Sequence, residues 1–427
     1  MFKFLHAADI HLDSPLRGLE RYDGAPVDRI RNATRRAVER LVRLAIAEKV
    51  QFVLLAGDLY DGAWKDYNTG LFLMNQLRLL SDARIHVVLL AGNHDAANRM
   101  TRSLRFPAEF VHALPTDRPD TVLLPAWNVA VHGQGFARQA VIEDLSQAYP
   151  RAVPGCFNVG LLHTCASGLE GHERYAPCTV EGLRAKQYDY WALGHIHMRQ
   201  VIHNDPPIVF PGNLQGRHVG ELGPKGCLIV TVADPHSPPQ VEFHRLDTVV
   251  WDVIDVPADQ FDHMDDLIDG TAQTMTERIR AEDDDRLVAA RVRVTGESPL
   301  HERLLANPAR WSNEIRAQAN AVGSDRLWLE RVQFETRPPS LANDLGEDGP
   351  LATLQGLLDE IRSDPQQQQE LLGLLKDLRR KLPPEWDAEG APSLLDDPQW
   401  ITGVLDRVGP LLVGRLQAGS RTTDLRP

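Results

Sequence analysis

Three apolar segments near the start of the chain each run directly into a short polar motif, and this pattern constrains the fold most. Residues 2–8 precede Asp9-Ile10-His11, residues 52–56 precede Gly57-Asp58, and residues 86–91 precede Gly92-Asn93-His94-Asp95. The stretches between them, residues 28–48 and 70–80, carry apolar side chains at helical spacing. This strand and helix alternation predicts an α/β fold with a largely parallel sheet and helices outside it.

The polar motifs are expected to meet at one edge of that sheet, because ligands of open α/β sheets bind beyond the carboxyl ends of the strands. Two further blocks follow apolar strands at residues 158–163 and 190–193. Asp, His and Asn are the side chains that hold Mn²⁺, Fe or Zn²⁺, and paired ions hydrolyse phosphate esters. The candidate metal ligands are Asp9, His11, Asp58, Asn93, His163, His195 and His197.

The position of each candidate ligand suggests a role. Asp58 is central in the motif order and is the candidate to bridge two ions roughly 3.5–4 Å apart. Asp9 and His11 alternate on what should be an extended segment, so one ion could take both, and His195 and His197 alternate in the same way.

His94 and its neighbour Asp95 are the candidate catalytic residues. A carboxylate beside an imidazole favours the protonated, oriented form. Such a histidine could stabilise the charge of a phosphate or protonate the leaving oxygen.

Three arginines are candidates for contact with a phosphate backbone. Arg99 and Arg102 recur at a spacing of three after the Gly-Asn-His-Asp block and would share a helix face, which is equally consistent with simple exposure to solvent. Arg217 lies in a Gln-Gly-Arg block.

Charge and length divide the chain into parts. It has 427 residues and a formal net charge of −13, but residues 1–245 hold 26 Lys and Arg against 25 Asp and Glu. The acidity therefore belongs to the C-terminal part, and the first part is not barred from nucleic acid. Neither a membrane-spanning run of about 20 apolar residues nor a CxxC pair is present, so a cytoplasmic protein without a membrane association is expected.

Three domains are expected, at residues 1–246, 247–337 and 338–427. The middle one should be a small α+β domain, with strands at 251–256, 287–294 and 328–334 and helices at 259–280 and 308–320. The last should be a linker and helical region, including a helix at 401–416. Its apolar stripe would pack on its own domain or dock on a partner's coiled coil.

The ordered motifs resemble the signature of the calcineurin-like metallophosphoesterases, Asp-x-His, Gly-Asp, Gly-Asn-His-Asp, His and Gly-His-x-His. Within that superfamily, residues 6–13 and 57–61 resemble the SbcD branch of double-strand-break repair nucleases. Residues 211–217 and 223–227 are similar to the YhaO exonuclease-like group. The resemblance covers roughly residues 1–245, and it implies a β-sandwich core with flanking helices and a capping middle domain.

The resemblance also implies a division of the ligands between two divalent ions. One ion would be held by Asp9, His11, Asp58 and His197, and the other by Asp58, Asn93, His163 and His195. Mn²⁺ is the usual metal in such nucleases, with Fe, Zn²⁺ or Mg²⁺ as alternatives. His94 would act on the scissile phosphate. The implied partners are DNA ends, a coiled-coil ATPase of the SbcC or YhaN kind, and a second copy in a homodimer.

Two departures from related patterns narrow the assignment. Some archaeal members carry a histidine three positions after the bridging aspartate, where this chain has Asp61. Protein phosphatases of the superfamily carry Arg-Gly after that position and Glu in place of Asp95, so the chain is not expected to be one.

The favoured hypothesis is a Mn²⁺-dependent DNA exonuclease in which water attacks the phosphodiester, acting in DNA repair. A second hypothesis keeps the metals but changes the substrate to a nucleotide or small phosphodiester. A third is a DNA-end-binding regulatory subunit that licenses a coiled-coil ATPase. Comparing the hydrolysis of linear DNA with that of free or cyclic nucleotides separates the first two hypotheses. Function that is retained after His94→Ala would favour the third.

Overall fold

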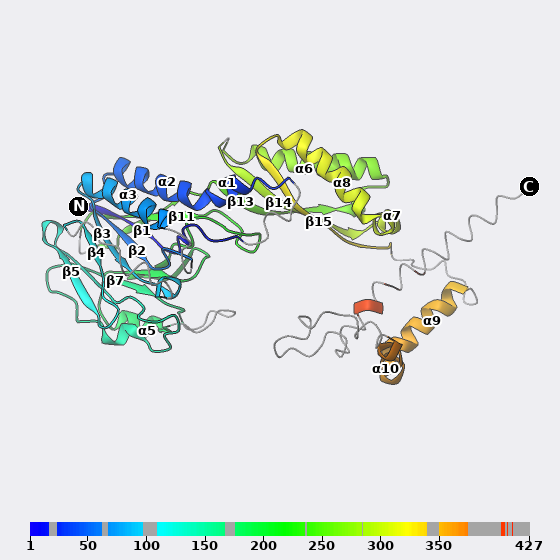
Figure 1. Cartoon of the computed structure of the whole chain (residues 1–427). Coiled ribbons are helices and arrows are strands. Elements are labelled where there is room, and N and C mark those ends of the chain that lie inside the picture. Colours follow the sequence, from blue (N-terminus) through cyan, green and yellow to red (C-terminus); the bar gives the residue numbers. More distant parts are fainter. Residues whose placement is uncertain are drawn as a thin grey trace, which may run out of the picture. The chain divides into compact units, whose positions relative to one another are not determined.

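The computed structural model describes residues 1–16, 24–61, 67–96, 109–166, 176–234, 237–283, 285–339 and 350–374, with positions 403–405, 408 and 412 (Figure 1). These residues form two compact units. The first contains residues 1–254, 275–291 and 319–331, and the second contains residues 255–274, 292–318 and 332–427.

The first sheet contains the strands that precede the first three motifs. Its order is β12-β11-β1-β2-β3-β4, with β1 to β4 parallel and β11 antiparallel to both β1 and β12. The strands are β1 (Phe2–Ala7), β2 (Phe52–Ala56), β3 (His86–Leu90), β4 (Val111–Ala113), β11 (Gly226–Val232) and β12 (Gln240–Arg245).

The second sheet contains the strands that lead to the last two motifs. Its order is β5-β6-β7-β8-β10-β9, in which β6, β7, β8 and β10 are parallel and the edge strands β5 and β9 are antiparallel. The strands are β5 (Asp120–Leu124), β6 (Val129–Gly133), β7 (Phe157–His163), β8 (Tyr190–Gly194), β9 (Gln200–Asn204) and β10 (Pro207–Phe210). Both sheets are therefore mixed, because antiparallel strands flank each parallel core.

The two sheets pack face to face, since their strands are apolar on both sides. Phe4 and Phe52 stack with ring centroids 4.8 Å apart, and Phe4 meets Tyr190 of the other sheet edge to face at 5.3 Å. The alternate side chains Leu5 and Val53 point the other way, into a core shared with two helices. The predicted sandwich with flanking helices is confirmed.

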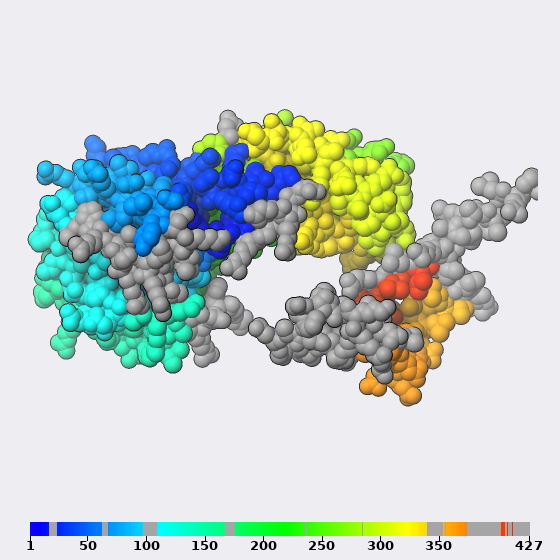
Figure 2. Space-filling model, in the orientation of Figure 1, coloured from blue at the N-terminus to red at the C-terminus, as the bar shows by residue number. Residues whose placement is uncertain are grey.

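Helices α2 (Ala33–Ala47) and α3 (Asn68–Asp82) supply that outer layer. Figure 2 shows their blue segments on one side of the first unit and the cyan segments of the second sheet on the other. The single helix predicted at residues 28–48 is divided at Asn32 into α1 (Val27–Arg31) and α2. The remaining helical elements of this part are α4 (Asn93–Ala96), α5 (Val180–Arg184), η3 (Pro125–Trp127) and η4 (Leu145–Ala148).

A third sheet has the order β13-β14-β15, and the boundary between the two units crosses its strands. Its elements are β13 (Val249–Pro257), η5 (Ala258–Gln260), α6 (Met264–Arg280), β14 (Leu287–Glu297), α7 (His301–Ala306), α8 (Pro308–Gly323) and β15 (Leu327–Arg337). This is the separate middle α/β domain that the sequence predicts, with α7 as an unexpected addition.

Two C-terminal helices follow, α9 (Pro350–Ser363) and α10 (Pro365–Leu374). Of the helix predicted at 401–416, helical positions are described only at 403–405, 408 and 412, and the rest lies outside the described residues. Among the helices that the structure describes, none combines the length and the apolarity needed to cross a bilayer.

Candidate metal centre

The candidate metal ligands lie where strands of both sheets end. Asp9, Asp58 and Asn93 follow β1, β2 and β3 of the first sheet, while His163 ends β7 and His195 follows β8 of the second. Neighbouring strands within each of these sets are parallel, so their carboxyl ends share one edge. The candidate ligands therefore converge at the ends of these strands as expected, and they come from both sheets.

The backbone at these loops is left-handed at four of the candidate ligands. The φ angles are 50° at Asp9, 47° at His11, 50° at Asp58 and 104° at His195. The predicted extended segments at residues 9–11 and 195–197 are therefore wrong. Non-glycine residues with positive φ are uncommon, and they cluster at functional sites where surrounding structure holds them. Here the N–H of Asp9 donates to Gly57 O at 3.1 Å and that of His11 to Asp58 O at 3.0 Å.

Two motif glycines are required by close packing around Asp58. A Cβ on Gly92 would lie 2.3 Å from Asp58 Oδ1, and one on Gly57 would lie 2.5 Å from His163 Nδ1. Gly57 also has a φ of +90°, which side chains rarely adopt. These glycines let the loops approach until the polar side chains meet.

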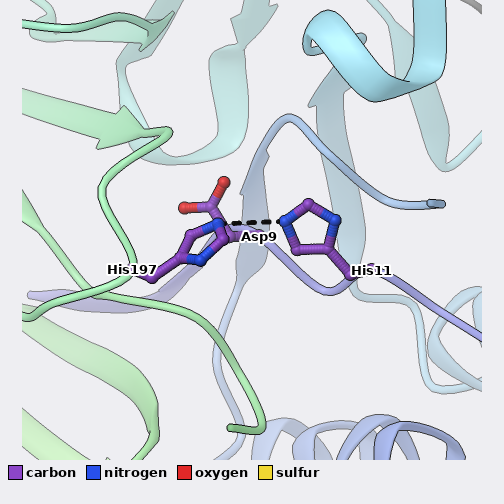
Figure 3. A group of neighbouring side chains, drawn as sticks. All are labelled: Asp9, His11 and His197. Carbon is purple, nitrogen blue, oxygen red and sulfur yellow. Dashed lines mark hydrogen bonds between the residues drawn. The ribbon is translucent and has the colours of Figure 1, made fainter. Parts of the chain in front are cut away.

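Asp9, His11 and His197 form the first group of possible ligands (Figure 3). Their ligand atoms lie within 4.8 Å of one another, and the Nε2 atoms of the two histidines are 3.0 Å apart. His197 Nδ1 donates to the Glu221 carboxylate at 2.8 Å, because a carboxylate can only accept. The Nε2 lone pair is then directed at the group, as it is in metal-bound histidines.

Asp58, His163 and His195 form a second group within the same limit of 4.8 Å. His163 Nδ1 donates to the Ala56 carbonyl at 2.9 Å, and its Nε2 lies 2.9 Å from the Asn93 Oδ1. The side chains of His163 and Asn93 therefore meet at the same point as the Asp58 carboxylate.

Asp58 belongs to the second group and also lies near His11 of the first. Its Oδ2 is 3.4 Å from His163 Nε2 and 3.9 Å from His11 Nε2. Burial alone would raise the pKa of Asp58, but the charge of His163 and its hydrogen bond hold that pKa well below the ordinary value. Asp58 is therefore ionised, as a bridging carboxylate must be. Burial raises the pKa of Asp9 to about 6.

His94 is paired with Asp61, and the expected partner Asp95 has another task. His94 Nδ1 is 2.8 Å from Asp61 Oδ1, and this hydrogen bond raises the pKa of the imidazole. The buried Asp95 carboxylate instead accepts hydrogen bonds from the backbone N–H groups of Leu59, Tyr60 and Gly92. The predicted pairing of His94 with Asp95 is wrong, because the side chain of Asp95 turns inward to tie the second loop to the third.

Arg217 links His197 and its partner Glu221 to Asp61, the partner of His94, rather than standing free for a substrate. Its guanidinium is 2.8 Å from Glu221, 3.4 Å from Asp61 and 3.3 Å from His197 Nδ1. These carboxylates raise the pKa of Arg217, against the effect of its burial. Arg99 and Arg102, the other two predicted substrate contacts, lie outside the described residues.

Sequence reasoning missed two carboxylates of this network. Glu221 orients His197 and Arg217, but no motif marks it, because it is brought in by the fold from 24 residues away. Asp61 is marked in the sequence by its position three residues after Asp58, where some archaeal members carry a histidine. That position alone does not predict its pairing with His94.

The donor set fits a pair of divalent cations. Asp9, His11, Asp58, Asn93 and His163 are at most 4% exposed, and the buried Nδ1 of His11 has no hydrogen-bond partner among the described residues. So many nitrogen and oxygen donors are costly to bury together unless a positive charge joins them. The arrangement can hold metals at three overlapping groups of side chains, namely the two above and a third made of His11, Asp58 and His94, with Asp61 beside them.

Two family models match the chain. Residues 2–199 match the calcineurin-like phosphoesterase family, and residues 251–337 match the middle domain of metallophosphoesterase YhaO. The first match contains all the candidate ligands, and the second covers the third sheet.

Two curated proteins are similar to part of the chain. An uncharacterized metallophosphoesterase YhaO from Bacillus subtilis is 36% identical over 253 residues, which are 58% of this chain and 61% of that protein. A DNA double-strand break repair protein Mre11 from Sulfurisphaera tokodaii is 25% identical over 206 residues, 48% of this chain and 51% of that one. The solved structure of a dimetal phosphatase from Danio rerio is 12% identical, with a TM-score of 0.35 over 56% of this chain and 98% of its own.

Proposed function

Because this chain belongs to the calcineurin-like metallophosphoesterases, we propose that it is a two-metal DNA exonuclease that hydrolyses phosphodiester bonds at DNA ends. The observation that carries the proposal is the convergence of the seven candidate ligands, Asp58 among them, next to a histidine paired with a carboxylate. The similarity to a protein named for double-strand break repair supports DNA as the substrate. The near-neutral charge of residues 1–245 is compatible with a polyanion.

The proposed centre assigns Asp9, His11, Asp58 and His197 to one ion and Asp58, Asn93, His163 and His195 to the other. When bound, two divalent cations polarise a phosphoryl oxygen and activate water for attack. Mn²⁺ is proposed because the donors are imidazole nitrogens with carboxylate and amide oxygens, although Fe, Zn²⁺ and Mg²⁺ accept overlapping sets.

His94 is proposed as the acid of the reaction. The hydrogen bond to Asp61 raises the pKa of the imidazole and fixes the orientation of the ring, so that a protonated Nε2 can donate to a phosphate or a leaving oxygen. Asp95 is proposed as a positioning residue, because it connects the loop of Asp58 to that of Asn93. Arg217 holds Glu221 and Asp61 in place and so acts through His197 and His94.

The partners that we propose follow from the similarity to the double-strand break repair protein. DNA ends, a coiled-coil ATPase of the SbcC or YhaN kind, and a second copy of the chain would complete a cytoplasmic repair complex. The similarity to the Mre11 protein supports this assembly. Co-purification of the tagged chain with a large ATPase from its own host would test it.

The experiment that tests the function is a nuclease assay on end-labelled duplex DNA with and without Mn²⁺. We expect shortening from the ends with Mn²⁺ only, and a loss of roughly 10²-fold or more in His94→Ala, the range for a lost general acid. His244→Ala, on β12, is the matched control. Intact DNA together with rapid hydrolysis of cyclic or free nucleotides would replace the exonuclease by a small phosphodiesterase.

A further inference from the structure

A cavity of about 450 Å³ lies in the first unit and shares two of its lining residues with the surroundings of the metal centre. Ser14 lines the cavity, and its Oγ donates to Asp61 Oδ2 at 2.6 Å. Arg217 lines it too, and its guanidinium contacts both Asp61 and the ligand His197. The cavity is thus a neighbour of the site where the scissile phosphate would bind, and it is separate from the ligands themselves.

Two indole rings form an aromatic wall of this cavity. Trp251 and Trp328 meet edge to face, with ring centroids 6.0 Å apart and planes at 78°. The Trp251 Nε1 donates to the carbonyl of Gly216 at 3.0 Å. This hydrogen bond fixes the ring beside the residue that precedes Arg217. The two tryptophans are 5% and 6% exposed, so a small part of each ring faces the cavity, and the rings have little side-chain freedom left to lose on binding.

A charged pair forms a polar part of the same lining. Arg291 and Glu330 are joined by two parallel hydrogen bonds, Nε to Oε2 at 2.8 Å and Nη2 to Oε1 at 2.9 Å. Because the two charges offset each other, the pair adds no net charge to the lining. Such a lining suits a neutral, planar group.

We propose that this cavity accepts a single unstacked nucleobase of the nucleotide whose phosphate lies at the metal centre. This inference rests on the proposed function and deepens it. The volume is in the range of pockets for one small molecule, and not for a duplex. Nucleobases stack on aromatic side chains irrespective of sequence, and enzymes that act at one nucleotide commonly draw its base out of the stack. Substrate turnover then requires the terminal base to leave the duplex.

The first test compares phosphates with and without a base on the native Mn²⁺-loaded protein. Deoxyguanosine 5′- and 3′-monophosphates and 2-deoxyribose 5-phosphate are measured as inhibitors of bis-para-nitrophenyl phosphate hydrolysis. We expect at least one nucleotide to inhibit about tenfold more tightly than the sugar phosphate. Equal inhibition by all three would overturn the proposal, even if the protein degrades DNA.

A matched pair of variants locates the effect. Arg291→Met removes the charged pair of the cavity, while Arg293→Met removes the equivalent pair with Asp255 two residues further along β14, outside the cavity. We expect Arg291→Met to reduce the advantage of the nucleotide over the sugar phosphate, and Arg293→Met to keep it. If both variants reduce this advantage equally and their thermal unfolding is unchanged, the effect does not come from the cavity. That result would contradict the proposal that the cavity binds the base.

A second readout needs no turnover. Duplex DNA with 5-iodouracil at either terminus is irradiated with the Mn²⁺-loaded His94→Ala protein, and the cross-linked peptides are identified by mass spectrometry. Cross-links to the peptides of Trp251 or Trp328 support a DNA end as the source of the base, and their absence in spite of DNA binding contradicts it. If only 5-iodo-deoxyuridine monophosphate cross-links there, the base is that of a free nucleotide, and the exonuclease proposal fails while the cavity assignment stands.

Discussion

The metal centre and the neighbouring cavity lie side by side but are held in different ways. The candidate ligands lie at or just after the ends of strands of a sandwich core, and backbone hydrogen bonds join the loops of Asp9 and His11 to the loop of Asp58. The lining of the cavity includes the side chains at positions 14, 217, 251, 291, 328 and 330, among which a ring contact and ion pairs are found, together with aliphatic side chains. Ligand geometry therefore depends on loops that the strands position, and the cavity depends on contacts between side chains.

This difference leads to different expectations for substitutions. A change at the metal centre should act in an all-or-none way, because the overlapping groups share Asp58 and His11. A change at the cavity should act in a graded way, because its aromatic wall and its charged pair are separate contributions. The predictions below probe the metal centre from its middle outward, in order of decreasing effect.

The largest effect is expected from Asp58→Asn. The amide keeps an acceptor for the N–H of His94, but it removes the negative charge between the two groups of ligands. We expect bound Mn²⁺ to fall and activity to drop at least about 10³-fold. Elemental analysis of the dialysed protein and hydrolysis of bis-para-nitrophenyl phosphate measure both. Asp82→Asn, at the exposed end of α3, is the control, and full metal content in Asp58→Asn would refute the bridging role.

A smaller effect is expected from Glu221→Gln. The glutamine can still accept from His197 Nδ1, but its charge no longer favours that tautomer or holds Arg217. We expect the affinity for Mn²⁺ to fall roughly 10- to 100-fold, as for other partners of metal-bound histidines. Titration followed by electron paramagnetic resonance gives the dissociation constant. Glu242→Gln on β12 is the comparison, and equal affinities in the two variants would show that Glu221 does not orient His197.

The smallest effect is expected at His6, which joins β1 to β8, the strands that lead to Asp9 and His195. Its ring contacts the Tyr190 hydroxyl at 3.0 Å and the Leu193 carbonyl at 3.1 Å, and burial lowers its pKa to about 3. The unfolded chain then binds this proton more readily than the folded one below the ordinary value of 6.5. Stability from this group is present above about pH 6.5 and is lost as the pH falls towards 3.

His6→Gln keeps a donor and an acceptor but cannot titrate. We expect the free energy of unfolding of this variant to depend less on pH, by about 1 kcal/mol per pH unit between roughly pH 4 and 6. Urea denaturation at several pH values gives this slope. Identical slopes for the variant and the parent would mean that His6 is not kept neutral by the fold, and the two strands would then be held by other contacts.

The strands that carry the metal centre were predictable because each is a short apolar run with a polar residue after it. Strands β4, β9 and β12 do not show this pattern, because they are short or alternate with polar residues, and they lie at sheet edges. Helix α2 lies within the helix predicted at residues 28–48. The division at Asn32 is not predicted, because the apolar spacing continues across it. The middle domain was predicted from the same alternation of strand and helix.

The sequence by itself determined the sandwich strands and the polar residues that end them, because hydrophobic periodicity and the order of motifs are local properties of the chain. Only the tertiary structure decided which carboxylate faces His94, that Glu221 reaches His197, and that two tryptophans and a charged pair enclose a cavity beside Arg217. It also decided the left-handed backbone at Asp9, His11, Asp58 and His195. These features depend on contacts between remote segments, which no local pattern records.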